Sequence, residues 1–201
     1  NNFTTNVLKM ATAPILTQII SFFSMPLIAR LFSPAMFGIY NLYSSIIDPI
    51  CSISTLGYHQ AIVLPKKENH SINILFTSLF ITLFSCVIVF FTYFLVPVSF
   101  LNKINFDLIE TYKWFIPISV AIHGFNSTFT GWNQRNAKFT TIASSRISHA
   151  FVNKLFLVII GLIGFASTGM LIIGFIFGSF IMLIIQISPF ILFIFKNKTY
   201  T

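Results

Sequence analysis

The chain has 201 residues, of which 56% are hydrophobic and only 8% are charged, and its mean hydropathy is +0.88. Soluble domains carry roughly 25% charged residues, so this composition excludes a soluble globular fold and indicates a surface covered by lipid. The net charge of +8 comes from lysines and arginines scattered between apolar runs, so we expect membrane topology, not nucleic acid, to explain it.

Six apolar runs are long enough to cross a bilayer as α-helices. A crossing needs about 20 residues, because a helix rises about 1.5 Å per residue through about 30 Å of hydrocarbon. In chain order the runs are 10–29, 37–64, 72–96, 114–134, 143–165 and 170–195. We therefore predict one all-α unit, a polytopic membrane protein whose six transmembrane helices form a single bundle.

Three local patterns predict how these helices begin, end and pack. After the first run, Ser33 can cap the next helix and Pro34 can occupy its first turn. Between the last two runs, the glycines and hydroxyl groups of 164–169 suit a tight turn between antiparallel helices. Gly174 and Gly178 form a small-xxx-small pattern, which we expect to pack helices within the chain rather than to drive dimerisation.

The distribution of positive charge predicts orientation, because Lys and Arg near the ends of spans stay in the cytoplasm. With the amino terminus inside, the inner set is Lys9, Lys66, Lys67, Arg135, Lys138, Arg146, Lys196 and Lys198, and the outer set is Arg30, Lys103 and Lys113. Eight against three predicts that both termini are cytoplasmic. Trp114 and Trp132, at opposite ends of the fourth run, are expected at the two headgroup layers.

Two charged residues fall near the middle of predicted spans. Asp48 and Lys154 each lie about eleven residues into a run, where a charge costs at least a few kcal/mol unless it is paired or hydrated. We expect both to face a hydrated cavity, with Lys154 offering a cation to an anionic substrate and Asp48 acting as its counter-ion or as a proton-coupling site. The alternative is an ion pair between them that only holds two helices together.

The fourth run carries an unusual number of polar side chains, which a membrane helix must hide from lipid. They are His123, Asn126, Ser127, Thr128 and Thr130. We expect this helix to line a cavity or a helix interface, and we select His123 and Asn126 as cavity-lining residues. A hydrogen bond between helices is the alternative interpretation of His123.

Motifs for enzymatic chemistry are missing from the sequence. No cluster of His, Cys, Asp or Glu has the spacing of a metal site, and no glycine-rich phosphate-binding loop is present. We therefore predict no catalytic residue, no bound metal, no cofactor and no ATP hydrolysis by this chain. It is expected not to be an enzyme.

Several stretches together resemble the Wzx-type polysaccharide flippases, the O-antigen and capsule repeat-unit translocases of the multidrug/oligosaccharidyl-lipid/polysaccharide exporter superfamily. The strongest similarity lies in Pro-Leu-Ile-Ala-Arg-Leu-Phe-Ser-Pro at 26–34 and Phe-Gly-Ile-Tyr-Asn-Leu-Tyr at 37–43. Ala-Ile-Val-Leu-Pro-Lys-Lys at 61–67 supports it, as do Trp132, Arg135, Phe139, Ala143, Ser145, Arg146 and Ile147. Position 59 departs from the family pattern, because His59 stands where that pattern has an acidic residue.

The resemblance implies a fold, a function and partners. The flippases that this chain resembles have a MATE-like fold, with two six-helix bundles around a cationic cavity. They move undecaprenyl-diphosphate-linked oligosaccharides across the bacterial inner membrane. This chain would be the N-terminal bundle, completed by a C-terminal bundle or a second copy, with membrane lipid and a polysaccharide polymerase as further partners. Arg30, Arg146 and Lys154 would contact the lipid diphosphate or acidic sugars.

Other functions remain open at this point. A cation-coupled multidrug or small-molecule exporter of the same superfamily would favour an acidic cavity, whereas the spans hold few acidic residues. A membrane-embedded enzyme of polysaccharide synthesis needs convergent groups at one face, where the outer loops offer only Asp107 and Glu110. A non-transporting assembly subunit is the third alternative.

Overall fold

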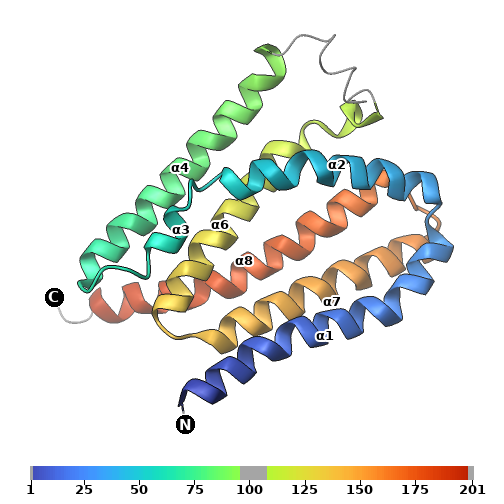
Figure 1. Cartoon of the computed structure of the whole chain (residues 1–201). Coiled ribbons are helices and arrows are strands. Elements are labelled where there is room, and N and C mark those ends of the chain that lie inside the picture. The colour runs from blue at the N-terminus through green and yellow to red at the C-terminus, as the bar shows by residue number, and fades with distance from the viewer. Residues whose placement is uncertain (1, 96–107, 199–201) are drawn as a thin grey trace.

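The structure, a computed structural model, describes the backbone of residues 2–95 and 108–198 and the side chains within 11–92, 95 and 108–196. Its helices are α1 (Asn2–Leu31), α2 (Pro34–Ile53), α3 (Tyr58–Ala61), α4 (Glu68–Leu95), the short 3-10 helix η2 (Glu110–Tyr112), α6 (Phe115–Arg135), α7 (Phe139–Ile163) and α8 (Thr168–Lys198) (Figure 1). These residues contain no strand, so the all-α fold class is confirmed. The side chains of Lys9 and Lys198 and the whole of Val96, Lys103 and Asp107 lie outside the described residues.

The helical bundle has the length and surface of a membrane protein. Residues 11–31, 68–92, 139–163 and 168–196 each form a helix long and apolar enough to cross a bilayer. Phe22, Phe23 and Phe80 are largely exposed, as on a surface that faces lipid. The chain is therefore a polytopic membrane protein. α2 and α6 carry more polar residues, and the total of six spans stays a prediction.

The predicted second run, 37–64, is divided into two helices. α2 ends at Ile53 and α3 begins only at Tyr58. Between them, Leu56 and Gly57 have φ values of 46° and 76°, in the left-handed region that cannot continue a right-handed helix. The run looked continuous because hydropathy carries no information about backbone angles, and Gly57 is the local signal of the break.

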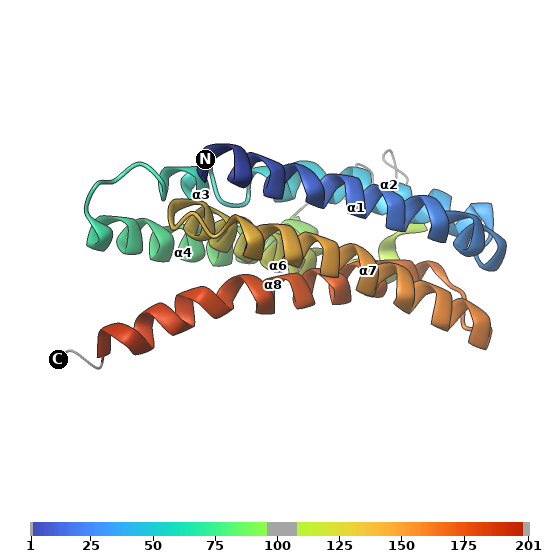
Figure 2. The same ribbon diagram turned by 90° about the horizontal axis from the view of Figure 1, so that it is seen from below.

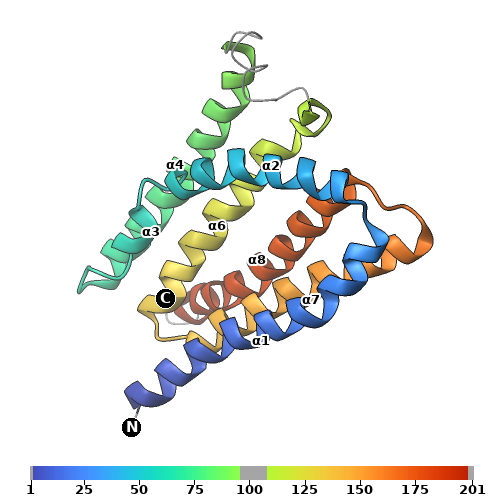
Figure 3. The ribbon, with the colours of Figure 1, turned by 45° about the vertical axis from the view of Figure 1, so that its right-hand side comes forward.

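The long helices pack side by side in the order α1, α7, α8, α6 and α4, and α2 crosses α6 and α8 (Figures 1 and 3). Seen from below, α1 and α2 lie on one side of α6 and α7, and α8 lies on the other (Figure 2). A Cβ on Gly178 would lie 2.9 Å from the carbonyl oxygen of His149, so this glycine lets α8 approach α7 closely. The small-residue pattern serves packing within the chain, as predicted.

Both predicted helix boundaries are confirmed. Ser33 Oγ accepts a hydrogen bond from the Met36 amide at 3.4 Å at the start of α2. Gly164, with φ of 88°, ends α7 before the turn to α8.

Trp132 is buried inside the bundle, so its ring does not face lipid headgroups as expected of an aromatic belt. The side chain is only 1% exposed and packs against Phe190 and Phe193 of α8, at ring-centroid distances of 5.1 and 5.3 Å. A large aromatic side chain near a helix end can therefore join a core when a neighbouring helix presents rings to it.

Candidate functional site

A cavity of about 600 Å³ lies among α2, α3, α6, α7 and α8. Its polar lining residues are Asp48, His59, Gln60, Ser119, His123, Asn126, Ser127, Thr130, Gln134, Arg146, His149 and Ser179. Asp48, Gln60, His123 and Arg146 are exposed, so the cavity opens to the outside of the chain. Polar and charged side chains thus gather around a space inside a bundle whose outer surface is apolar.

The structure brings four of the predicted site residues to this cavity. Asp48 comes from α2, His123 and Asn126 from α6, and Arg146 from α7. Sites built from side chains of facing helices are typical of helical bundles. Arg30, an exposed residue in the last turn of α1, does not line the cavity.

Lys154 also lies outside the cavity, contrary to our expectation. Gly161, two turns further along α7, packs against Leu31 of α1, so Lys154 occupies the face of α7 that meets α1. Among the residues whose side chains are described, no ion pair joins Lys154 to Asp48, so the alternative interpretation fails as well. Apart from Asn153, the residues that flank Lys154 in the sequence are apolar, and they gave no indication of which face of the helix would be inside.

One face of α6 builds much of the polar wall. Lining residues recur there every three or four positions: Ser119, Ile122, His123, Asn126, Ser127, Thr130, Gly131 and Gln134. Residues at this spacing share one side of a helix. Ser119 and Gln134 were not predicted as lining residues, although their helical spacing from His123, Asn126 and Thr130 is a signal for them.

α3 places His59 and Gln60 in the wall. The Thr55 hydroxyl and His59 Nδ1 share a hydrogen bond of 2.6 Å across the helix break. Gly131 of α6 allows the close approach, because a Cβ there would collide with the carbonyl oxygen of His59. The sequence marks His59 only as a departure from the family pattern and gives no signal for Gln60, because the position of both in the wall depends on the helix break before them.

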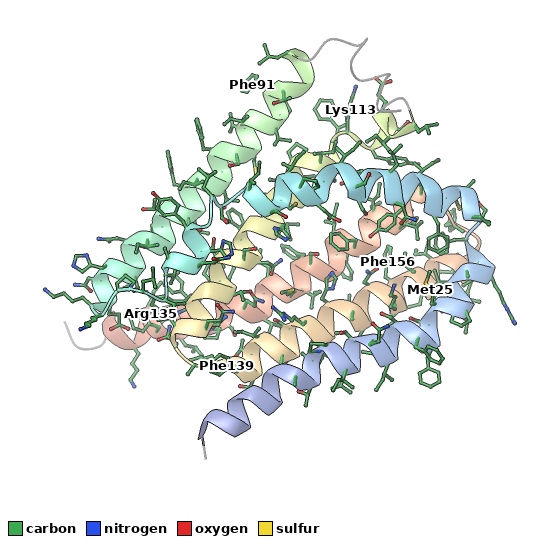
Figure 4. All side chains as sticks on the ribbon, in the orientation of Figure 1. Met25, Phe91, Lys113, Arg135, Phe139 and Phe156 are labelled. Atoms are coloured by element: carbon green, nitrogen blue, oxygen red, sulfur yellow. The ribbon has the colours of Figure 1, made fainter. Side chains whose placement is uncertain are left out.

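Arg135 anchors the segment that follows α3. Its Nη1 donates to the carbonyl oxygen of Pro65 at 2.5 Å and lies 3.5 Å from those of Ile62 and Val63. Figure 4 labels Arg135 at this end of the bundle, close to where α6 ends. Hydrogen bonds from a charged donor contribute about 1.5–3 kcal/mol, so this contact fixes the chain on the far side of α3.

Two asparagines of α6 anchor α8 in the same manner. Asn126 Nδ2 donates to the carbonyl oxygen of Ser179, and Asn133 Nδ2 donates to that of Gln186, both at 3.0 Å. In each amide, Oδ1 is buried without a hydrogen-bond partner, which costs about 1–3 kcal/mol. Of the two asparagines, only Asn126 lines the cavity.

His149 is a second cavity residue with a buried, unpartnered atom. Its ring meets the Phe175 ring edge-on at a centroid distance of 5.4 Å. Nε2 is buried and has no hydrogen-bond partner. In the neutral ring this nitrogen either donates or accepts a hydrogen bond, according to the tautomer.

The cavity offers groups for a polar ligand with an anionic part, beside one acidic side chain, Asp48. Arg146 offers a guanidinium that pairs well with phosphate or carboxylate, and α6 offers hydroxyl and amide groups. Among the described residues, no group of three or more His, Cys, Asp or Glu could hold a metal.

Comparison with known proteins adds one match. A family model described as polysaccharide biosynthesis protein matches residues 3–201. A search of curated proteins and a search of solved structures returned no match. The family match covers all the elements that form the cavity.

Proposed function

Because the chain belongs to the polysaccharide biosynthesis protein family, we propose that it translocates undecaprenyl-diphosphate-linked oligosaccharide repeat units across the bacterial inner membrane. These units would supply O-antigen, capsule or exopolysaccharide synthesis. The observation that carries the proposal is a cavity of about 600 Å³ that polar and charged side chains from five helices help to line, inside a bundle with an apolar outer surface. A lipid-linked sugar needs such a path, because its polyprenyl chain can stay in lipid whereas its headgroup cannot.

The guanidinium of Arg146 supports an anionic headgroup, and Asp48 balances its formal charge in the lining. Arg146 is proposed to receive the diphosphate or an acidic sugar, and Asp48 is proposed as its counter-ion or as the coupling group. Arg30 and Lys154 are proposed as further cations on the transport path. Since neither lines this cavity, their contacts would be made outside it.

The open side of the cavity is an argument for a partner that covers it. We propose that a second six-helix bundle, either a C-terminal half or a second copy, covers this side, that both termini are cytoplasmic, and that a polysaccharide polymerase takes over the product. The exposure of Asp48, His123 and Arg146 agrees with such a cover, because charged and polar side chains in a membrane face protein or water rather than lipid.

The test is transport in proteoliposomes containing the full-length protein. A lipid-linked oligosaccharide loaded into the inner leaflet should become accessible to an external lectin and should be recovered chemically unchanged. Recovery of an altered product would support a membrane-embedded enzyme instead. Movement of lipophilic cations without movement of the oligosaccharide would support a drug exporter, and movement of neither would support an assembly subunit.

A further inference from the structure

We propose that Asn126 and His149 form a subsite that hydrogen-bonds neighbouring hydroxyl groups of a sugar. This inference rests on the proposed function and deepens it, because it divides the cavity between the saccharide and the phosphate of the ligand. It starts from two buried polar atoms of cavity-lining residues, Asn126 Oδ1 and His149 Nε2, that the fold leaves unpartnered.

The orientation of Asn126 is fixed by its neighbour on α8. Its amide nitrogen donates to the Ser179 carbonyl oxygen at 3.0 Å, and that oxygen cannot accept from the other end of the amide. Oδ1 is therefore committed to the role of acceptor. The residue is 6% exposed and lines the cavity, so its unpartnered oxygen belongs to the wall and not to the lipid surface.

His149 supplies the second unpartnered atom, Nε2, at the same level of α8. Gly178 lies against the backbone of His149, and Ser179, the next residue, is bonded to Asn126. The close α7–α8 approach thus places two unpartnered polar atoms, from different helices, beside adjacent residues of a third helix.

The hydrogen-bonding groups of Asn126 and His149 determine whether the sugar or the diphosphate of the lipid-linked ligand fits this subsite. An ionised diphosphate has only acceptor oxygens, so it cannot satisfy Asn126 Oδ1. A sugar hydroxyl both donates and accepts, so it suits Asn126 Oδ1 and either tautomer of His149, and adjacent carbons of one ring carry two such groups. Arg146, one turn before His149 on α7, is the group suited to the anion.

Access to this subsite requires a small rearrangement. Asn126 Oδ1 and His149 Nε2 are both inaccessible to solvent in this conformation. A sugar therefore reaches them only when neighbouring side chains of the wall shift, and the two new hydrogen bonds favour that shifted state.

Binding of methyl β-D-glucopyranoside to the purified full chain in nanodiscs, followed by saturation-transfer NMR, tests the proposal. Asn126→Leu and His149→Phe should each weaken binding about tenfold, as expected for the loss of one hydrogen bond. Asn133→Leu is the matched control, because it removes the same kind of anchor from the same helix without touching the cavity. Inorganic pyrophosphate should retain its affinity for Asn126→Leu and lose it in Arg146→Gln.

Equal weakening by Asn126→Leu and Asn133→Leu, or unchanged glucoside binding in Asn126→Leu, would overturn the subsite. A diazirine-labelled glucoside tests the unmodified protein as well: labelling within 119–134, 146–153 or 175–182 supports the proposal, and labelling confined to α1 or α4 contradicts it. If the sugar binds as expected but proteoliposomes show no transport, the proposed function fails and the subsite stands. If transport occurs and sugar binding is unaltered in Asn126→Leu, the subsite fails and the proposed function stands.

Discussion

At the scale of single residues, Arg146 carries the positive charge of the cavity. Among the residues that the structure describes, no other Lys or Arg side chain lines the cavity. Arg146 is also exposed, on the side where the cavity is open. A guanidinium binds phosphate and carboxylate through paired hydrogen bonds, and a partly dehydrated cavity strengthens that attraction.

Replacing Arg146 with glutamine should slow transport of a lipid-linked oligosaccharide about 10- to 100-fold, because a hydrogen bond to a charged group contributes about 1.5–3 kcal/mol. The measurement is the initial rate in proteoliposomes at equal protein content. Lys138→Gln is the control, since Lys138 is exposed outside the cavity. Equal slowing in both variants would show that net charge alone matters.

The sequence predicts which side chains need a polar environment more reliably than it predicts the direction in which each side chain points. Asp48 and Asn126 were selected because polar groups in apolar runs need a hydrated or bonded environment, and both line the cavity. Lys154 was selected for the same reason, but its position on the α1-facing side of α7 depends on how two helices pack. His149 was missed because its place in the wall follows from the glycines of α8, which sequence alone does not align with it.

At the scale of elements, the broken α2–α3 segment determines the shape of the cavity wall. Its position depends on Gly131, where the backbone of His59 leaves no room for a Cβ, and on Arg135, which bonds to the Pro65 carbonyl oxygen. No hydropathy pattern predicts this segment, because it depends on two left-handed residues and on contacts far apart in the chain.

Gly131→Ala should destabilise the protein by about 1–3 kcal/mol, because the new methyl group must displace α3 or bend α6. Thermal unfolding in detergent, followed by intrinsic fluorescence, measures the effect. Gly38→Ala is the matched control: Gly38 lies in a helix with no atom within 4 Å of the position that a methyl group would occupy, and alanine should stabilise that helix by up to about 1 kcal/mol. Equal midpoints for the two variants would contradict the close α3–α6 contact.

Arg135→Gln should loosen the connection between α3 and α4 without unfolding the bundle. The Pro65 carbonyl oxygen would lose its charged donor. Hydrogen exchange of residues 62–67 should accelerate, while exchange in α7 and α8 stays unchanged. Unchanged exchange in 62–67 would show that Arg135 is not the anchor.

At the scale of the whole molecule, the distribution of positive charge gives an orientation that experiment can check. In a Cys51→Ser, Cys86→Ser background, single cysteines at positions 66 and 138 should be protected from an impermeant maleimide added outside the cell. A cysteine at position 113 should react. Labelling of positions 66 or 138 from outside would reverse the orientation.

The overall architecture combines a lipid-facing exterior with an internal polar space. The apolar runs predicted the helices and their membrane environment, because long apolar helices are stable in lipid and not in water. The cavity could not be located in the same way, since it forms where α3, α6, α7 and α8 approach one another through glycines and amide contacts.

The central claim is that the headgroup of the transported lipid passes through this cavity. Ser127→Trp places a large side chain in the lining, and Ser144→Trp places one on an exposed part of α7 outside it. Transport of a lipid-linked oligosaccharide in proteoliposomes should stop in Ser127→Trp and continue at the unmodified rate in Ser144→Trp, with both proteins folded and equally incorporated. Undiminished transport in Ser127→Trp would contradict the account.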